Sequence, residues 1–144
     1  MRSGIMLEAL YPNCLDLQRL VYLDYLLVHS GDVKGPPSLH PASPMRTGEV
    51  VVRRGLVERG LALLCAKGLA LRSASSDGIV YAGSEHLGAF LGALNSQYVA
   101  SLRAVALWVA ASFGDAEFVE LQATLGRVTD AWSVEFDVAE DRDA

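Results

Sequence analysis

The segment between Arg46 and Tyr81 constrains the fold of this chain more than any other part of the sequence. Apolar residues at helical spacing, interrupted by glycines, predict one short helix beginning near Thr47 and a second over about 56–67. Two short apolar segments on either side of an Asp-Gly turn then predict a β-hairpin. Two short helices followed by a hairpin are typical of a winged helix-turn-helix, a fold that binds DNA or docks onto a protein partner.

The remaining predicted elements are mostly helical. Residues 1–12 have no clear period and are expected to be an irregular lead-in, with Asn13 as the N-cap of the next helix. That helix has 11 apolar residues out of 15, so we expect it to lie at the centre of the domain. The helices predicted outside the central segment are 14–28, 85–94, 97–113 and 116–129, and the hairpin strands are 69–72 and 79–81.

The predicted fold class is mainly α with a small β-hairpin, a winged helix-turn-helix-like domain with additional C-terminal helices. We predict one domain over residues 1–138 and a solvated acidic tail over 139–144. Trp132, Val134 and Phe136 alternate with polar residues, which indicates a short strand that adds to a sheet elsewhere.

Composition narrows the environment of the chain. Although 51% of its 144 residues are hydrophobic, no apolar run approaches the ~18 to 20 residues that a membrane span needs. No secretory signal is evident at the start, so a cytoplasmic location is predicted. Cys14 and Cys65 lie in apolar helical patterns and are expected to be buried free thiols, as in a reducing compartment.

Charge is unevenly distributed along the chain. The net charge is −5, which argues against tight nonspecific binding of nucleic acid by the whole chain. Residues 45–72 nevertheless contain six basic residues and two acids, whereas residues 114–144 contain two basic residues and nine acids. The basic residues that are candidates for nucleic-acid or partner contact are Arg53, Arg54, Arg59, Lys67 and Arg72.

Two interpretations of this basic cluster remain open. In one, Arg53, Arg54 and Arg59 meet DNA phosphates or guanines from the second helix of the winged-helix unit. In the other, Arg53 and Arg59 pair with neighbouring glutamates on a solvated face. The hairpin loop lacks a basic residue, and the presumed recognition helix is mostly Leu and Ala, which favours a protein partner over phosphate.

The region between His86 and Gly114 is almost uncharged. Arg103 is the only formally charged residue among the 27 intervening positions, which implies burial on nearly all sides. A domain of this size rarely supplies so much burial alone, so part of the region is expected to face a partner. The candidate interface residues here and in the final segment are Phe90, Leu91, Leu94, Tyr98, Leu102, Leu107, Trp108 and Trp132.

Motifs for catalysis, metal binding or cofactor binding are not found. The chain has no phosphate-binding glycine loop, no Cys-x-x-Cys and no nucleophile elbow, and its three histidines lack ligand-like spacing. Asp16 and Asp24 lie eight residues apart on one helix face, and a polar stripe with Arg19 is a simpler account of them than a catalytic carboxylate pair. We therefore expect no catalytic residue, metal or cofactor.

Several segments resemble the middle component of bacterial ABC three-component systems. The most distinctive are His-Ser-Gly-Asp at 29–32 and Gly-Pro-Pro-Ser-Leu-His-Pro at 35–41. Segments 7–20, 24–30, 48–49, 53–61, 67–69 and 77–81 fit the same pattern, and the resemblance covers about residues 7–113.

The resemblance implies an assembly role. Such systems overlap with Lamassu-type anti-phage and anti-plasmid defence, and pair an SMC-like ABC ATPase with an effector, often a nuclease. The middle component is expected to be a non-catalytic winged-helix subunit docked on the ATPase, similar to the winged-helix proteins of condensin-like complexes. It would help to hold the effector inactive until the ATPase senses foreign DNA, which this subunit reaches through the complex.

Three functions therefore stand as hypotheses. The resemblance and the uncharged 86–114 region favour an assembly subunit, the basic cluster favours a winged-helix transcriptional regulator, and nothing favours a small enzyme. The proline-rich connection after residue 29, which contains His40, is either a loop that a partner recognises or a rigid brace under the first helix.

Overall fold

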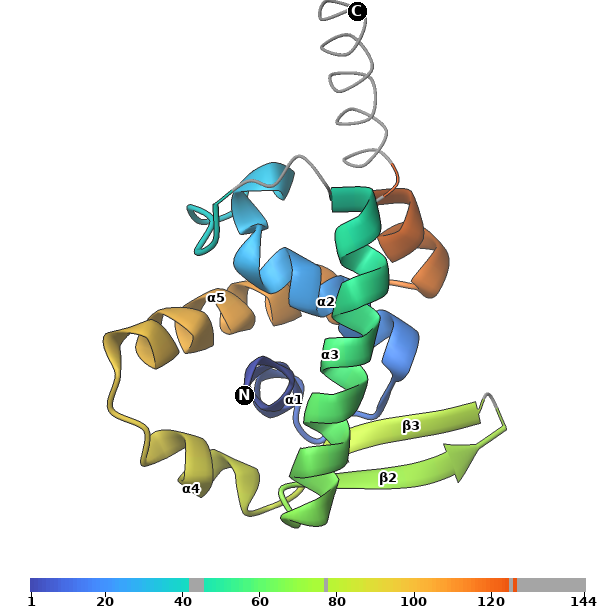
Figure 1. Cartoon of the computed structure of the whole chain (residues 1–144), viewed down its shortest axis with the longest axis vertical. Coiled ribbons are helices and arrows are strands. Elements are labelled where there is room, and N and C mark those ends of the chain that lie inside the picture. Colours follow the sequence, from blue (N-terminus) through green and yellow to red (C-terminus); the bar gives the residue numbers. More distant parts are fainter. Residues whose placement is uncertain (42–45, 77, 125, 127–144) are drawn as a thin grey trace, which may run out of the picture.

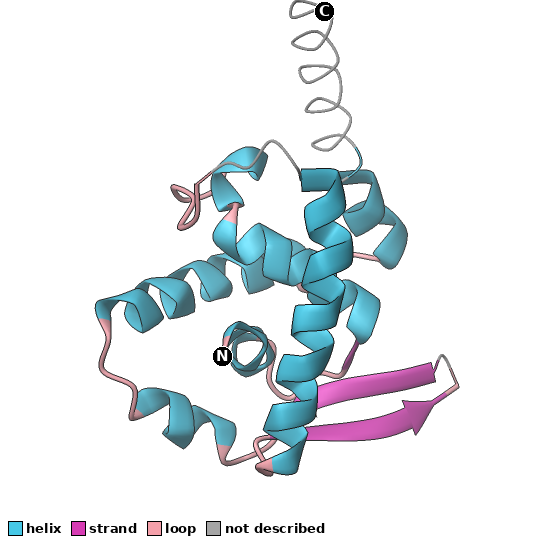
Figure 2. Cartoon of the chain, in the orientation of Figure 1, coloured by secondary structure: helices cyan, strands magenta, loops and turns pink. Residues whose placement is uncertain are grey.

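The computed structural model describes residues 1–41, 46–76, 78–124 and 126, and describes the backbone alone for residues 46–51. It is mainly helical with a small antiparallel sheet (Figures 1 and 2). The elements are α1 (Arg2–Ala9), β1 (Leu15–Asp16), α2 (Leu17–Val28), the 3₁₀ helix η1 (Ser30–Val33), α3 (Arg46–Ala66), β2 (Ala70–Ser75), β3 (Gly78–Gly83), α4 (Leu87–Gly92) and α5 (Gln97–Phe113). Residues 118–124 are also helical.

The start of the chain differs most from its prediction. In place of an irregular lead-in, α1 is a helix whose Ile5, Met6 and Leu7 are buried almost completely. It contacts α2, α3, α4, α5 and β3, and Figure 1 shows it near the middle of the molecule. The prediction was wrong because five consecutive residues of α1, including Ser3 and Gly4, are buried, so that its sequence has no amphipathic period to detect.

The predicted pair of helices between Thr47 and Lys67 is one continuous helix, α3, so that prediction was wrong. Gly55 and Gly60 lie inside α3, and each costs roughly 1 kcal/mol relative to alanine. That cost is offset by the burial of Val57, Leu61 and Leu64 in the core. Burial of each of these side chains stabilises the fold by up to about 3 kcal/mol. Gly68, with φ +73°, follows the helix in the left-handed conformation that glycine adopts readily.

The hairpin prediction is confirmed and extended. Strands β2 and β3 pair antiparallel from Ala70 opposite Gly83 to Ser75 opposite Gly78. Two residues that precede α2 add a third strand, so that the sheet order is β1-β3-β2.

The predicted helix 14–28 begins later, at Leu17. Asp16, rather than Asn13, caps α2 by accepting a hydrogen bond from the Arg19 backbone N–H at 2.8 Å. Helix 97–113 is confirmed as α5, and helix 85–94 is the shorter α4. The predicted strand around Trp132 and the acidic tail 139–144 lie outside the described residues.

The two cysteines are free thiols, but Cys14 is exposed and Cys65 is only half-buried. Burial of Cys14 was wrongly predicted because that residue precedes β1 rather than lying inside a helix. No single helix in the described part of the chain is long and apolar enough to cross a membrane, although α5 and residues 118–124, bent by 115°, pass such a test of length and composition together.

Candidate partner interface

Arg53, a predicted contact residue, is not available at the surface. Its guanidinium is buried against the Asp24 carboxylate of α2, to which Nη1 donates a hydrogen bond within an ion pair. The same nitrogen lies 3.4 Å from the Asp24 carbonyl oxygen, and the guanidinium lies over the Tyr25 ring at 5.5 Å. Arg53 therefore joins α3 to α2 inside the domain, and its side chain is not exposed for the predicted nucleic-acid or partner contact.

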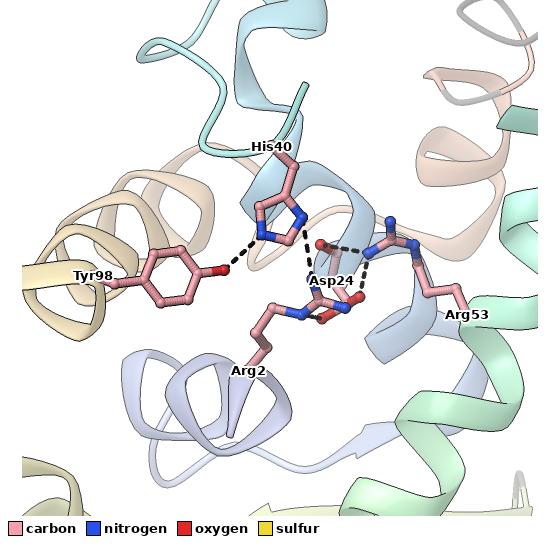
Figure 3. A network of polar contacts seen from close by, with 5 residues as sticks. All are labelled: Arg2, Asp24, His40, Arg53 and Tyr98. Carbon is pink, nitrogen blue, oxygen red and sulfur yellow. Dashed lines mark hydrogen bonds and ion pairs between the residues drawn. The ribbon is translucent and has the colours of Figure 1, made fainter. Parts of the chain in front are cut away.

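Asp24 has a second arginine partner, from α1. Arg2 Nε lies 3.1 Å from Asp24 Oδ1, so one carboxylate that is 2% exposed neutralises two guanidinium groups (Figure 3). A buried arginine requires such a partner, because an unpaired buried charge is strongly destabilising. Asp24 is therefore structural, and of the polar stripe that the sequence indicated, Asp24 is buried whereas Asp16 and Arg19 are partly exposed.

His40 extends this network to α5. Its Nδ1 accepts a long hydrogen bond of 3.5 Å from Arg2, and its Nε2–H donates to the Tyr98 hydroxyl at 2.6 Å (Figure 3). Since arginine can only donate, these contacts require the neutral histidine with its proton on Nε2. Partial burial, followed by the positive charge of Arg2, lowers the pKa of His40 below its ordinary value.

The proline-rich connection that carries His40 is held by contacts within the chain. Ser30 Oγ donates to the Pro36 carbonyl at 2.8 Å, and Ser38 Oγ accepts from the Gly31 N–H at 3.0 Å. A Cβ on Gly35 would lie 2.4 Å from the Trp108 ring of α5, so only glycine fits there. These contacts favour the brace over the partner-recognition loop.

The other predicted basic residues are exposed. Arg54, Arg59, Lys67 and Arg72 make no ion pair with a described residue. The predicted ion pair between Arg59 and Glu58 is therefore not formed.

Exposed apolar residues accompany these cations along α3. Val52, Leu56 and Leu63 are 65%, 49% and 59% exposed. The sequence did not predict that these three residues share one exposed surface, because the glycines of α3 indicated two separate helices. Their positions i, i+4 and i+11 place them on one face only if the helix is continuous.

The candidates around α4 and α5 divide into two groups. Phe90, Leu94, Tyr98 and Leu107 are exposed, although Tyr98 also contacts His40. Leu91 and Leu102 are core residues, at 1% and 0% exposure, so in this structure they lie inside the domain rather than at its surface. Trp108 is half-buried against Gly35 and Phe113, and Trp132 lies outside the described residues.

Arg103, the lone charge of the 86–114 region, holds α5 to α1. Its Nε and Nη2 donate to Glu8 Oε1 at 3.1 and 2.6 Å, beside a shallow groove of about 430 Å³ between the two helices. No group of three or more His, Cys, Asp and Glu side chains in the described part of the chain is placed to hold a metal ion.

A comparison with protein families decides what kind of protein has these surfaces. The sequence model of ABC-three component (ABC-3C) system Middle Component 2 matches residues 1–135. The chain belongs to this family. Among the curated proteins and the solved structures that were compared, none matches the chain. Membership of the Middle Component 2 family implies that the other components of a three-component ABC system are partners of this chain.

Proposed function

We propose that the chain is a non-catalytic assembly subunit that docks onto the ATPase of its three-component system. The family match over residues 1–135 carries this proposal, because a middle component acts together with other components. The exposed apolar residues of α3 and α5 support it, since both helices present large side chains to solvent and thus surface for a partner.

The proposed partners are an SMC-like ABC ATPase and an effector of the nuclease type, as in Lamassu-type defence against phage and plasmids. In this role the chain helps to hold the effector inactive until the ATPase senses foreign DNA in the cytoplasm. The resemblance of segments 29–32 and 35–41 to such middle components supports this assignment.

A winged-helix fold is part of the same proposal. The order α1-β1-α2-α3-β2-β3 and the strand order β1-β3-β2 agree with that fold. The helix pair would then be α2 and α3 rather than two halves of α3, and the braced connection after residue 28 takes the place of the short turn. Helix α3 becomes the helix that such domains present to a ligand.

A winged-helix transcriptional regulator is the alternative function. The observation in its favour is the set of exposed cations on and after α3, which make no ion pair with a described residue. Against it, Val52, Leu56 and Leu63 lie among these cations, and an aliphatic side chain gains little by facing phosphates.

Co-purification separates the two functions. A tagged full-length chain is expressed together with the products of the adjoining genes and analysed by size exclusion and mass spectrometry. We expect a stable complex that contains a long coiled-coil ATPase. If the chain instead eluted as a monodisperse homodimer without those products, and shifted the mobility of one DNA sequence, it would be a transcriptional regulator rather than an assembly subunit.

A further inference from the structure

One face of α3 forms a continuous exposed row, here called the α3 stripe: Val52, Leu56, Arg59 and Leu63. The spacing i, i+4, i+7, i+11 keeps these residues on one side of the helix over about 16 Å. The core-facing side of the same helix contains Val57, Leu61 and Leu64. Helix α3 is therefore apolar on two sides, and the described residues of the domain cover only one of them.

The charge at the stripe is positive. Arg59 lies within the apolar row and makes no ion pair with a described residue. Residues 52–76 contain five basic residues and one acid, and of the five only Arg53 makes an ion pair with a described residue, Asp24. A ligand that covers the stripe must bury Arg59, and a buried guanidinium needs a carboxylate.

We propose that the α3 stripe is the docking site for an amphipathic helix of another component of the system. That helix has apolar residues at i, i+4 and i+7 and an Asp or Glu that faces Arg59. The inference rests on the proposed assembly function and specifies the surface. A helix fits because rows at i±4 on one helix pack into the grooves of another, and the acid complements the otherwise unpaired guanidinium.

The same features argue against two other occupants. In a second copy of this chain, a two-fold contact through the stripe would bring the two Arg59 side chains together near its centre, and like charges repel. Duplex DNA would pair with Arg59 but would leave three aliphatic residues against phosphates. A partner that is both apolar and acidic would bury the three aliphatic side chains of the stripe and pair with its arginine.

The test uses two matched pairs of variants in the full-length chain, co-expressed with the adjoining gene products. Leu56→Glu is matched by Leu71→Glu, since Leu71 is 59% exposed on β2. Arg59→Glu is matched by Arg54→Glu, which lies about 140° around α3 from Arg59. Thermal unfolding of each purified variant verifies that it folds. We expect all four to fold, because the four positions are exposed.

We expect Leu56→Glu and Arg59→Glu to reduce the amount of co-purified partner at least tenfold, with Leu71→Glu and Arg54→Glu close to wild type. Full retention of the partner by both stripe variants would overturn this inference and leave the assembly function standing. A wild-type chain that captures no component would instead overturn the assembly function itself. A duplex-DNA shift by the wild type that Arg59→Glu abolishes would assign the stripe to nucleic acid.

Discussion

At the scale of single residues, the Asp24 carboxylate pairs with two arginines and so neutralises their charges where the chain is folded around them. Arg2 in α1 and Arg53 in α3 are 51 residues apart in the sequence, yet both reach the Asp24 side chain. Neighbouring residues on a helix point about 100° apart, so Arg53 faces inward while Arg54 faces solvent. The sequence shows both arginines but not which one has Asp24 as its partner.

Replacement of Asp24 by alanine tests this role. We expect Asp24→Ala to lower the free energy of unfolding by about 3 kcal/mol or more, because it leaves the buried Arg53 guanidinium without its carboxylate. Arg54→Ala, at an exposed position, is the control and should change the stability by about 0.5 kcal/mol or less. Urea unfolding measures both, and an Asp24→Ala variant as stable as wild type would show that the network contributes little.

His40 makes the network sensitive to pH. Its folded-state pKa is lowered from 6.5, so below pH 6.5 the unfolded chain takes up the proton before the folded chain does. The stability of the wild type should therefore be unaffected by His40 above that pH and fall as the pH drops through the window below it. In urea unfolding at pH 7.5 and 5.5, His40→Gln should lose less stability than wild type, and equal losses would contradict this prediction.

At the scale of elements, local signals were sufficient for the hairpin and α5 but not for α3. An Asp-Gly pair between short apolar segments is a strong local signal for a hairpin, and the Ser96 side chain caps α5 by accepting a hydrogen bond from the Val99 N–H. The glycines of α3 gave the opposite local signal, a break. Helix α3 is continuous because its buried face packs against α1 and α2, contacts that no window of sequence contains.

Continuity of α3 can be tested at Gly55. A Cβ there would lie 3.7 Å from the flexible end of Arg59, which is ordinary contact. We therefore expect Gly55→Ala to stabilise the domain by about 0.5–1 kcal/mol, as alanine does in a helix interior. Gly68→Ala is the control that should destabilise it, because Gly68 has φ +73°. If α3 instead turned at Gly55, thermal unfolding would show a loss of stability in both variants.

At the scale of the whole molecule, the candidate surface was less predictable than the fold class. A mainly helical domain with one hairpin follows from periodicity and turn residues alone. The division of residues between core and surface does not, as Leu91 and Leu107 show. They have the same side chain in the same uncharged region, but Leu91 is 1% exposed and Leu107 is 63% exposed. That difference depends on where α1 lies, and α1 had no detectable sequence signal.

The stability of the whole domain therefore depends on helix α1 more than on any other element. It contacts every other helix from α2 to α5 as well as β3, so its removal exposes apolar surface on all of them at once. We expect deletion of residues 1–9 to abolish cooperative thermal unfolding. A milder change, Leu7→Ala at a residue with 0% exposure, should cost about 2–5 kcal/mol.

Tyr11→Ala provides the matched control just beyond α1, because Tyr11 is 54% exposed and its removal should have a much smaller effect. Circular dichroism and urea unfolding measure all three variants. If the truncated chain unfolded cooperatively with near-wild-type stability, residues 1–9 would contribute little to the core. We expect the opposite, because Ser3 to Leu7 are buried and a closely packed interior cannot fill the space that the loss of α1 would leave.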